Sequence, residues 1–73
     1  MERMFRIILT PEAEGGFTVS VPSLPGCITW GETIGEAKEM AAEAIALYLE
    51  DLETNGEDIP NDMNSLELSL LVD

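Results

Sequence analysis

Alternation of apolar and polar residues predicts two extended strands in the first third of the chain. In residues 4–10, the side chains of Phe5, Ile7 and Leu9 fall on one face of a strand. Residues 17–21 read Phe-Thr-Val-Ser-Val, which turns three apolar side chains toward a core and leaves Thr and Ser outward. The stretch between the strands contains Pro11 and two glycines, so we expect a hairpin loop there.

A rigid connector and a third strand are predicted next. Residues 22–26 read Pro-Ser-Leu-Pro-Gly, and two prolines that fix φ and remove backbone donors must end the second strand. Residues 27–30, Cys-Ile-Thr-Trp, are short, favour extended structure and stop at Gly31. We therefore expect a third antiparallel strand over 27–30.

After residue 32, apolar residues recur every three or four positions instead of every second one, which predicts a helix over residues 33–54. Thr33 is placed to cap its start, with Glu36 completing a capping box, and Asn55-Gly56 supply a stop. One side of the helix is apolar and predicted to cover a sheet. It carries Ile34, Ala37, Ala41, Ala44, Ile45, Tyr48 and Leu52.

A final alternation, in residues 65–72, predicts a fourth strand after an acidic linker that contains Pro60. Its inward side would carry Leu66, Leu68, Leu70 and Val72. The expected fold is therefore α+β, with the two-layer order β-β-β-α-β. We expect a mostly antiparallel four-stranded sheet of order 3-2-1-4, with the single helix covering one face.

Composition limits what such a domain could do. The chain has 73 residues and fits one domain, 1–73, with a thin stability margin. Fifteen Asp and Glu against three Lys and Arg, with no His, give a net charge of −12. This charge repels phosphate, so we expect no direct contact with nucleic acid.

The same inventory disfavours catalysis and bound ions. A single cysteine, Cys27, without any histidine, argues against an internal disulfide and against the usual zinc sites. The acidic residues near the helix end lack the alternating spacing of a calcium loop. The sequence therefore predicts no enzyme, metal site or cofactor. Without a signal peptide or membrane span, we expect a cytoplasmic protein.

One segment resembles a known family. Residues 17–27 read Phe-Thr-Val-Ser-Val-Pro-Ser-Leu-Pro-Gly-Cys, and Glu32-Thr-Ile-Gly-Glu-Ala follows after Thr29 and Gly31. This is similar to the HicB-like antitoxins, in which a strand ends at a proline, a Leu-Pro-Gly-Cys turn follows, and a helix opens with Thr-x-x-Glu-Ala. The resemblance covers about residues 4–60.

The resemblance implies a partial RNase H-like fold and a role in a toxin–antitoxin pair. The partner would be HicA, a small basic mRNA-cleaving toxin that such antitoxins bind and cover. Many relatives carry a further DNA-binding module. Since the chain stops at Asp73, we expect a stand-alone form without that module.

Two features of the sequence could bind such a partner. Acidic residues gather on the helix side opposite the apolar one, and could meet a basic surface; they are Glu36, Glu39, Glu43, Glu50 and Glu53. The alternative is a solvated helix face, which charge runs usually are. Trp30 could anchor a partner or simply cover the edge of the core.

Self-association is the second kind of binding that we expect. A fourth strand at the sheet edge would expose unpaired backbone groups beside a leucine-rich segment. We expect a dimer or a higher assembly through this strand or the open sheet face, with Leu66, Leu68, Leu70 and Leu71 at the interface. A non-inhibitory, structural or regulatory homo-oligomer derived from antitoxins is therefore the alternative function.

Overall fold

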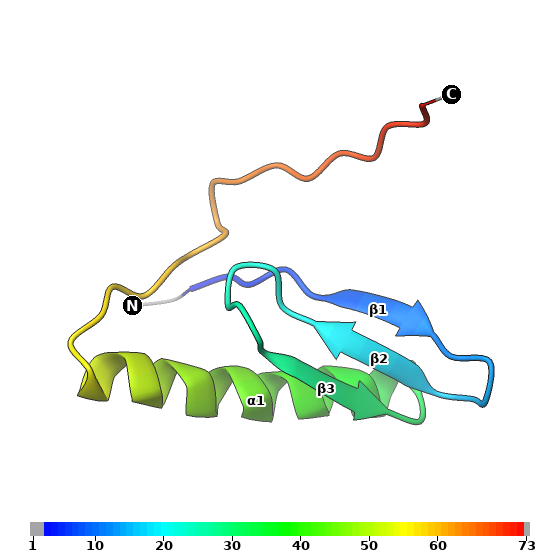
Figure 1. Ribbon diagram of the computed structural model, residues 1–73, viewed down its shortest axis with the longest axis horizontal. Coiled ribbons are helices and arrows are strands. Elements are labelled where there is room, and N and C mark those ends of the chain that lie inside the picture. Colours follow the sequence, from blue (N-terminus) through cyan, green and yellow to red (C-terminus); the bar gives the residue numbers. More distant parts are fainter. Residues whose placement is uncertain (1–2, 73) are drawn as a thin grey trace.

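The computed structural model, which describes residues 3–72, contains three strands and one helix. The strands are β1 (Ile8–Pro11), β2 (Phe17–Ser20) and β3 (Ile28–Gly31), and the helix is α1 (Ile34–Thr54). Both strand pairs are antiparallel and the sheet order is β1-β2-β3. The helix lies across one face of the sheet (Figure 1). The predicted meander and helix are confirmed.

Strand register decides which side chains face the helix. Leu9, Val19 and Thr29 lie in one cross-strand row, and Phe17 lies beside Gly31 in the next row on the same face. Val19 is fully buried, and Leu9 and Phe17 pack around it. This is the inner face, which the helix covers.

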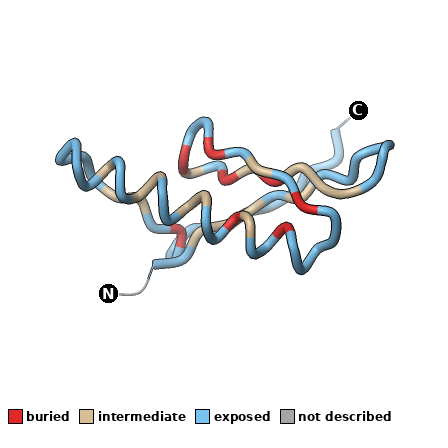
Figure 2. The backbone as a smooth tube through the Cα atoms, turned by 90° about the horizontal axis from the view of Figure 1, so that it is seen from below, coloured by how far each residue is buried: buried red, intermediate tan, exposed pale blue. Residues whose placement is uncertain are grey.

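The core consists of two small clusters. In the first, Val19 packs against Ala37 and Ala41 of α1. In the second, Val21, Leu24 and Cys27, all from the segment between β2 and β3, pack against the second half of the helix. Figure 2 shows that most of the backbone is exposed or intermediate and that the buried positions are few. Small alanines on the helix allow this close approach, and the buried core is small, as is typical of so short a chain.

Both ends of α1 are fixed by the residues that the sequence indicates. Thr33 is the N-cap, and its Oγ1 accepts a hydrogen bond from the backbone N–H of Glu36 at 3.0 Å. A Cβ atom on Gly31 would meet the backbone of Ala37, so the chain can enter the helix this closely only with glycine. At the other end, Gly56 has φ +69° and stops the helix. Ile34, expected on the covered side, lies in the first turn of the helix and is 58% exposed.

The predicted fourth strand is wrong, and with it the four-stranded sheet of order 3-2-1-4. The described sheet has three strands, and the arm, residues 64–72, leaves the body of the protein (Figure 1). The chain first comes alongside the segment before β1, where the N–H of Asp62 donates to the carbonyl of Met4 at 2.7 Å. A turn closed by the Ser65 N–H and the Asp62 carbonyl, 3.1 Å apart, follows. Beyond this turn the backbone leads away from β1, so the alternation finds no strand to pair with.

Candidate protein-binding surfaces

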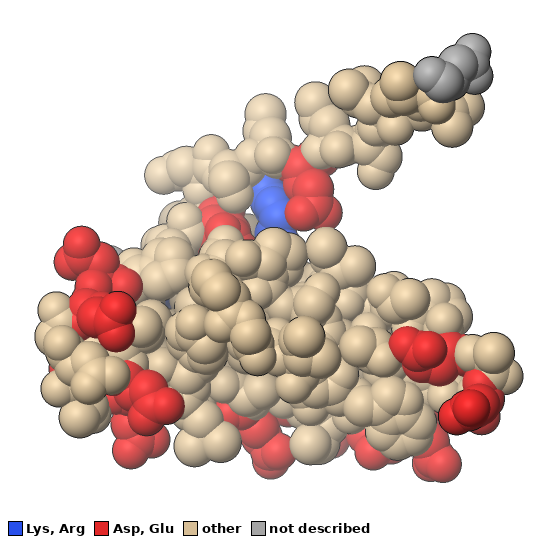
Figure 3. All heavy atoms as spheres, viewed as in Figure 1, with Lys and Arg blue, Asp and Glu red and all other residues tan. Residues whose placement is uncertain are grey.

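The acidic stripe comprises Glu36, Glu39, Glu43, Glu50 and Glu53, and the structure leaves all five exposed. It runs along the side of α1 that faces away from the sheet, because the opposite side packs on the core. In Figure 3, carboxylates line the lower border of the molecule beneath the helix, whereas the middle of the visible face carries none. The stripe is therefore an exposed negative margin with only Lys38 as a positive charge on the helix.

The outer face of the sheet is a second exposed surface, and it is largely uncharged. Register places Ile8 and Ile28 on either side of Ser20, and both isoleucines are exposed, at 42% and 64%. Thr18 pairs with Trp30 in the next row. Trp30 is 46% exposed, so a large apolar ring is open to solvent on the face that the helix does not cover.

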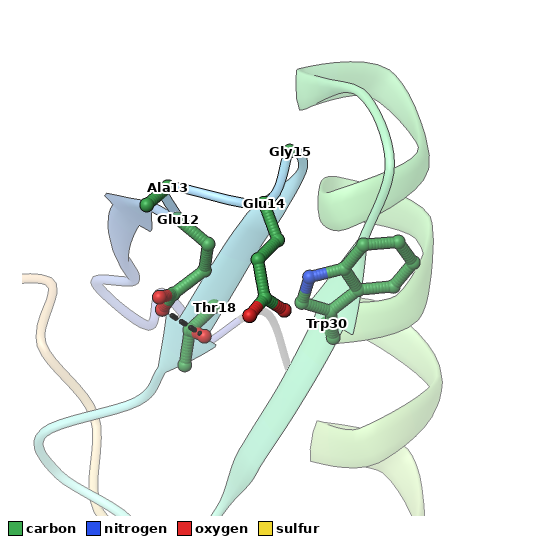
Figure 4. A pocket seen from close by; sticks show the side chains of 6 residues that line it. All are labelled: Glu12, Ala13, Glu14, Gly15, Thr18 and Trp30. Atoms are coloured by element: carbon green, nitrogen blue, oxygen red, sulfur yellow. Dashed lines mark hydrogen bonds between the residues drawn. The ribbon is translucent and has the colours of Figure 1, made fainter.

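Trp30 lines a shallow hollow together with the turn that joins β1 and β2. Glu12, Ala13, Glu14 and Gly15 form one side, and Thr18 and Trp30 the other. Figure 4 shows the carboxylate of Glu14 beside the indole and that of Glu12 turned to Thr18, whose hydroxyl donates a hydrogen bond to it. We call this arrangement the tryptophan hollow.

The indole of Trp30 is held in place by the backbone beneath it. A Cβ atom on Gly16 would overlap the indole ring, and Gly16 has φ +77°, a value that glycine adopts without strain. The ring therefore packs directly on the turn backbone. An aromatic face beside carboxylates is suited to a cationic side chain, which gains both cation–π and charge attraction.

The structure separates two features that the sequence suggested as one partner site. The acidic stripe lies on the helix layer, whereas Trp30 lies on the outer face of the sheet. Trp30 is instead brought together with Glu12 and Glu14, which the sequence reasoning missed. Only the register of β2 with β3 reveals this neighbourhood, since the hairpin turn lies 15 or more positions before Trp30.

The turn after β2 is architectural. The N–H of Leu24 donates to the Val21 carbonyl, and the N–H of Cys27 to the Leu24 carbonyl, each at 2.9 Å. The hydroxyl of Tyr48 on α1 donates to the carbonyl of Pro25 at 2.8 Å and ties the turn to the helix. Cys27 is buried, and this burial raises the pKa of its thiol, which agrees with a packing role.

Asp62 is the one buried charged residue among those described, and the sequence gave no sign of it. Its carboxylate accepts hydrogen bonds from the Ser23 hydroxyl and from the backbone N–H of Arg6. These bonds lower the pKa of Asp62, with the charge of Arg6 acting in the same direction. The residue joins the N-terminal segment, the turn after β2 and the base of the arm.

Beyond Asp62, the arm carries the residues predicted to form an interface. Leu66, Leu68 and Leu70 are 85% to 90% exposed, and Leu71 is fully exposed. The structure brings none of them against another part of the described chain. Within residues 3–72 there is also no cluster of three His, Cys, Asp or Glu that could hold a metal ion, and no helix is long and apolar enough to cross a membrane.

Comparison with known proteins assigns the chain to one family. Residues 5–70 match the family described as the HicB-like antitoxin of bacterial toxin–antitoxin systems. The match covers the strands, the helix and most of the arm. The chain therefore belongs to the HicB-like antitoxin family.

Individual relatives agree with this assignment. A UPF0150 protein of Thermoplasma acidophilum is 41% identical over 66 residues, which are 90% of this chain and 94% of the relative. A UPF0150 protein of Synechocystis is 37% identical over 57 residues, or 78% of each chain. Antitoxin HicB of Escherichia coli K12 is 38% identical over 65 residues, which cover 84% of this chain but only 46% of that protein.

Proposed function

We propose that this protein is an antitoxin-type binding module that neutralises a small, basic HicA-type mRNA interferase by direct contact. Membership of the HicB-like antitoxin family supports the antitoxin role. The main observation that indicates a basic partner is the exposed acidic stripe on α1. Its five carboxylates have little positive charge near them, so a basic protein would be attracted and other acidic proteins repelled.

The tryptophan hollow gives this proposal a second contact point. Trp30 packs on the backbone of Gly16, is half exposed and lies beside Glu12 and Glu14. This environment favours the binding of a Lys or Arg side chain. Tryptophan residues at protein interfaces often contribute a large share of the binding free energy. Binding through both surfaces would require the partner to reach across the sheet edge, so the two sites are to be tested separately.

The test measures affinity for a small basic HicA-type toxin, and the protection of mRNA from that toxin. In E39Q/E43Q two stripe charges are lost, and the net charge falls from −12 to −10. We expect affinity to fall about fivefold and its salt dependence to weaken, since exposed pairs contribute roughly 0.2–1 kcal/mol each. The matched control, E57Q/E67Q, changes net charge equally at exposed positions outside the helix and should retain affinity.

Three outcomes would contradict the proposal in different ways. If both double variants lose affinity equally, net charge rather than the stripe attracts the partner. If W30A binds as tightly as the unaltered chain, the tryptophan hollow is not a contact point. Failure to protect mRNA at saturating protein would rule out neutralisation itself.

The second candidate is a structural or regulatory homo-oligomer that inhibits no toxin. The specific observation favouring it is the arm, whose exposed leucines need no basic partner. A genome without a small basic open reading frame next to this one would favour the second candidate. Protection of mRNA in the assay above would favour the first.

A further inference from the structure

The outer edge of β1 lacks a neighbouring strand, and the arm could supply one, but the two do not meet within the described chain. In the described chain β1 has only β2 as a neighbour, so its outer edge is open. Ile7 and Leu9, the side chains at this edge of the inner face, are only half-buried although they pack against the core. One more strand beside β1 would cover them.

The arm has the composition of the missing strand but points away. Leu66, Leu68, Leu70 and Val72 alternate with other residues, and all are at least 79% exposed. Residues 65–72 would span about 26 Å if extended, which exceeds the length of the four-residue β1. An exposed eight-residue segment in which apolar side chains alternate in this way is a template for strand pairing.

The base of the arm directs it away from its own sheet. Asp62 is anchored by three hydrogen bonds, from Arg6, from Ser23 and to Met4. The Asp62–Ser65 turn is closed twice, because both the N–H and the hydroxyl of Ser65 donate to the Asp62 carbonyl. For the arm to pair with β1 of its own chain, this turn would have to open.

Charge identifies the partner as a second copy of this chain. Two molecules that each carry −12 repel one another over most of their surface. The segment leading into β1 is the exception, since it holds Arg3 and Arg6, two of the three cationic residues of the chain. The arm carries only Glu67 within residues 65–72, so an arm beside this edge avoids the repulsion that the rest of the surface imposes.

We propose that two copies exchange arms, each arm pairing as a strand with the β1 edge of the other copy. Because each chain supplies one arm and one edge, two exchanges close a symmetric dimer and leave neither half unpaired. The leucines of the arm cover Ile7 and Leu9 of the partner. The exchange does not depend on the binding of a toxin.

The mass of the purified full chain, by light scattering over a dilution series, is the first measurement. We expect twice the monomer mass of 8.0 kDa. L68K/L70K places two charges on the pairing side and should raise the dimer dissociation constant about a hundredfold or more. The control S69K/L71K places two lysines on the other side of the alternation, leaves Glu67 in place and should remain dimeric. Circular dichroism checks that both variants keep the helix.

The second measurement separates exchange from pairing within one chain. In a dimer mixed from isotopically labelled and unlabelled chains, isotope-filtered NOEs should join Leu68 or Leu70 methyl protons to Leu9 methyl protons of the other chain. A monomer at all concentrations, or a dimer that L68K/L70K leaves intact, would overturn the proposal. So would contacts found only within a chain, or an arm that becomes protected only after a basic toxin is added.

Discussion

The carboxylate of Asp62 accepts a hydrogen bond from the backbone N–H of Arg6 at 2.8 Å, across 56 positions of the sequence. Since the N–H of Asp62 donates to the carbonyl of Met4, the two segments run side by side at this point. The Ser23 hydroxyl donates to the same carboxylate. One side chain therefore fixes where the N-terminal segment, the turn after β2 and the arm meet.

Asp62 should make the stability of the protein depend on acid pH. The hydrogen bond from Ser23, followed by that from Arg6, lowers the pKa of Asp62 in the folded state. A lowered pKa stabilises the fold while the group is ionised, above the unfolded-state value of about 3.9. That stabilisation is lost as pH falls through the folded-state pKa.

The variant D62N tests this dependence by thermal unfolding between neutral and acid pH. We expect its Tm to lie below that of the unaltered protein at pH 7, and the two to converge as the pH drops below about 4. D58N removes an equal charge at an exposed position and should follow the unaltered protein. A constant difference between D62N and the unaltered protein at every pH would argue against the role of ionised Asp62.

Gly16→Ala should destabilise the protein and displace Trp30. The new methyl group would overlap the indole ring, and the φ of +77° strains any residue with a Cβ. Together these effects should cost about 1–3 kcal/mol. Gly15→Ala is the matched control, since Gly15 has φ +105° but open space around it.

Trp30 is the only tryptophan, so its fluorescence spectrum reports on the indole directly. We expect the emission spectrum to change in G16A and to stay the same in G15A. Equal spectra in the two variants would mean that Trp30 does not pack on Gly16.

Tyr48→Phe should loosen the turn after β2 while leaving the apolar packing in place. The variant loses the hydrogen bond from the Tyr48 hydroxyl to the Pro25 carbonyl. We expect unfolding free energy to fall by about 0.5–1 kcal/mol, because the bond is solvent-exposed. Hydrogen exchange should speed up at Leu24 and Cys27, whose amides close the turn, and not in the first half of α1.

Removing charge from the acidic stripe should raise stability even as it weakens binding. Glu39 and Glu43 lie four positions apart on α1, where like charges repel by roughly 0.2–0.5 kcal/mol per pair. E39Q/E43Q should therefore unfold at a higher temperature at low salt. The difference should shrink as salt is added, because exposed charges are screened. A lower Tm at low salt would mean that the stripe is not under internal repulsion.

Local chemistry explains what could be predicted. Alternation marked β2, and Thr33 and Gly56 marked the two ends of α1, because strands, caps and stops depend on a few neighbouring residues. The covered side of the helix was predicted at Ala37 and Ala41 for the same reason. Ile34 was predicted wrongly, because helical spacing alone does not tell whether the first turn of a helix is covered by another element.

The candidate surfaces show where such reasoning ends. The five glutamates of the stripe are exposed as expected, since helical spacing alone sets them opposite the apolar side. The tryptophan hollow was missed because Glu12 and Glu14 meet Trp30 only through strand pairing. The alternation of Leu66, Leu68 and Leu70 indicated what a strand would bury, but it carried no information on whether a strand lay within reach.

The sequence by itself determined the three-stranded meander, the helix and the charge of this protein, since each follows from spacing and composition along a short stretch. Only the tertiary structure decided that residues 62–65 turn away from β1, because the anchoring of Asp62 joins residues from three distant segments. In the described chain, the outer edge of β1 and the leucines of the arm therefore both remain uncovered.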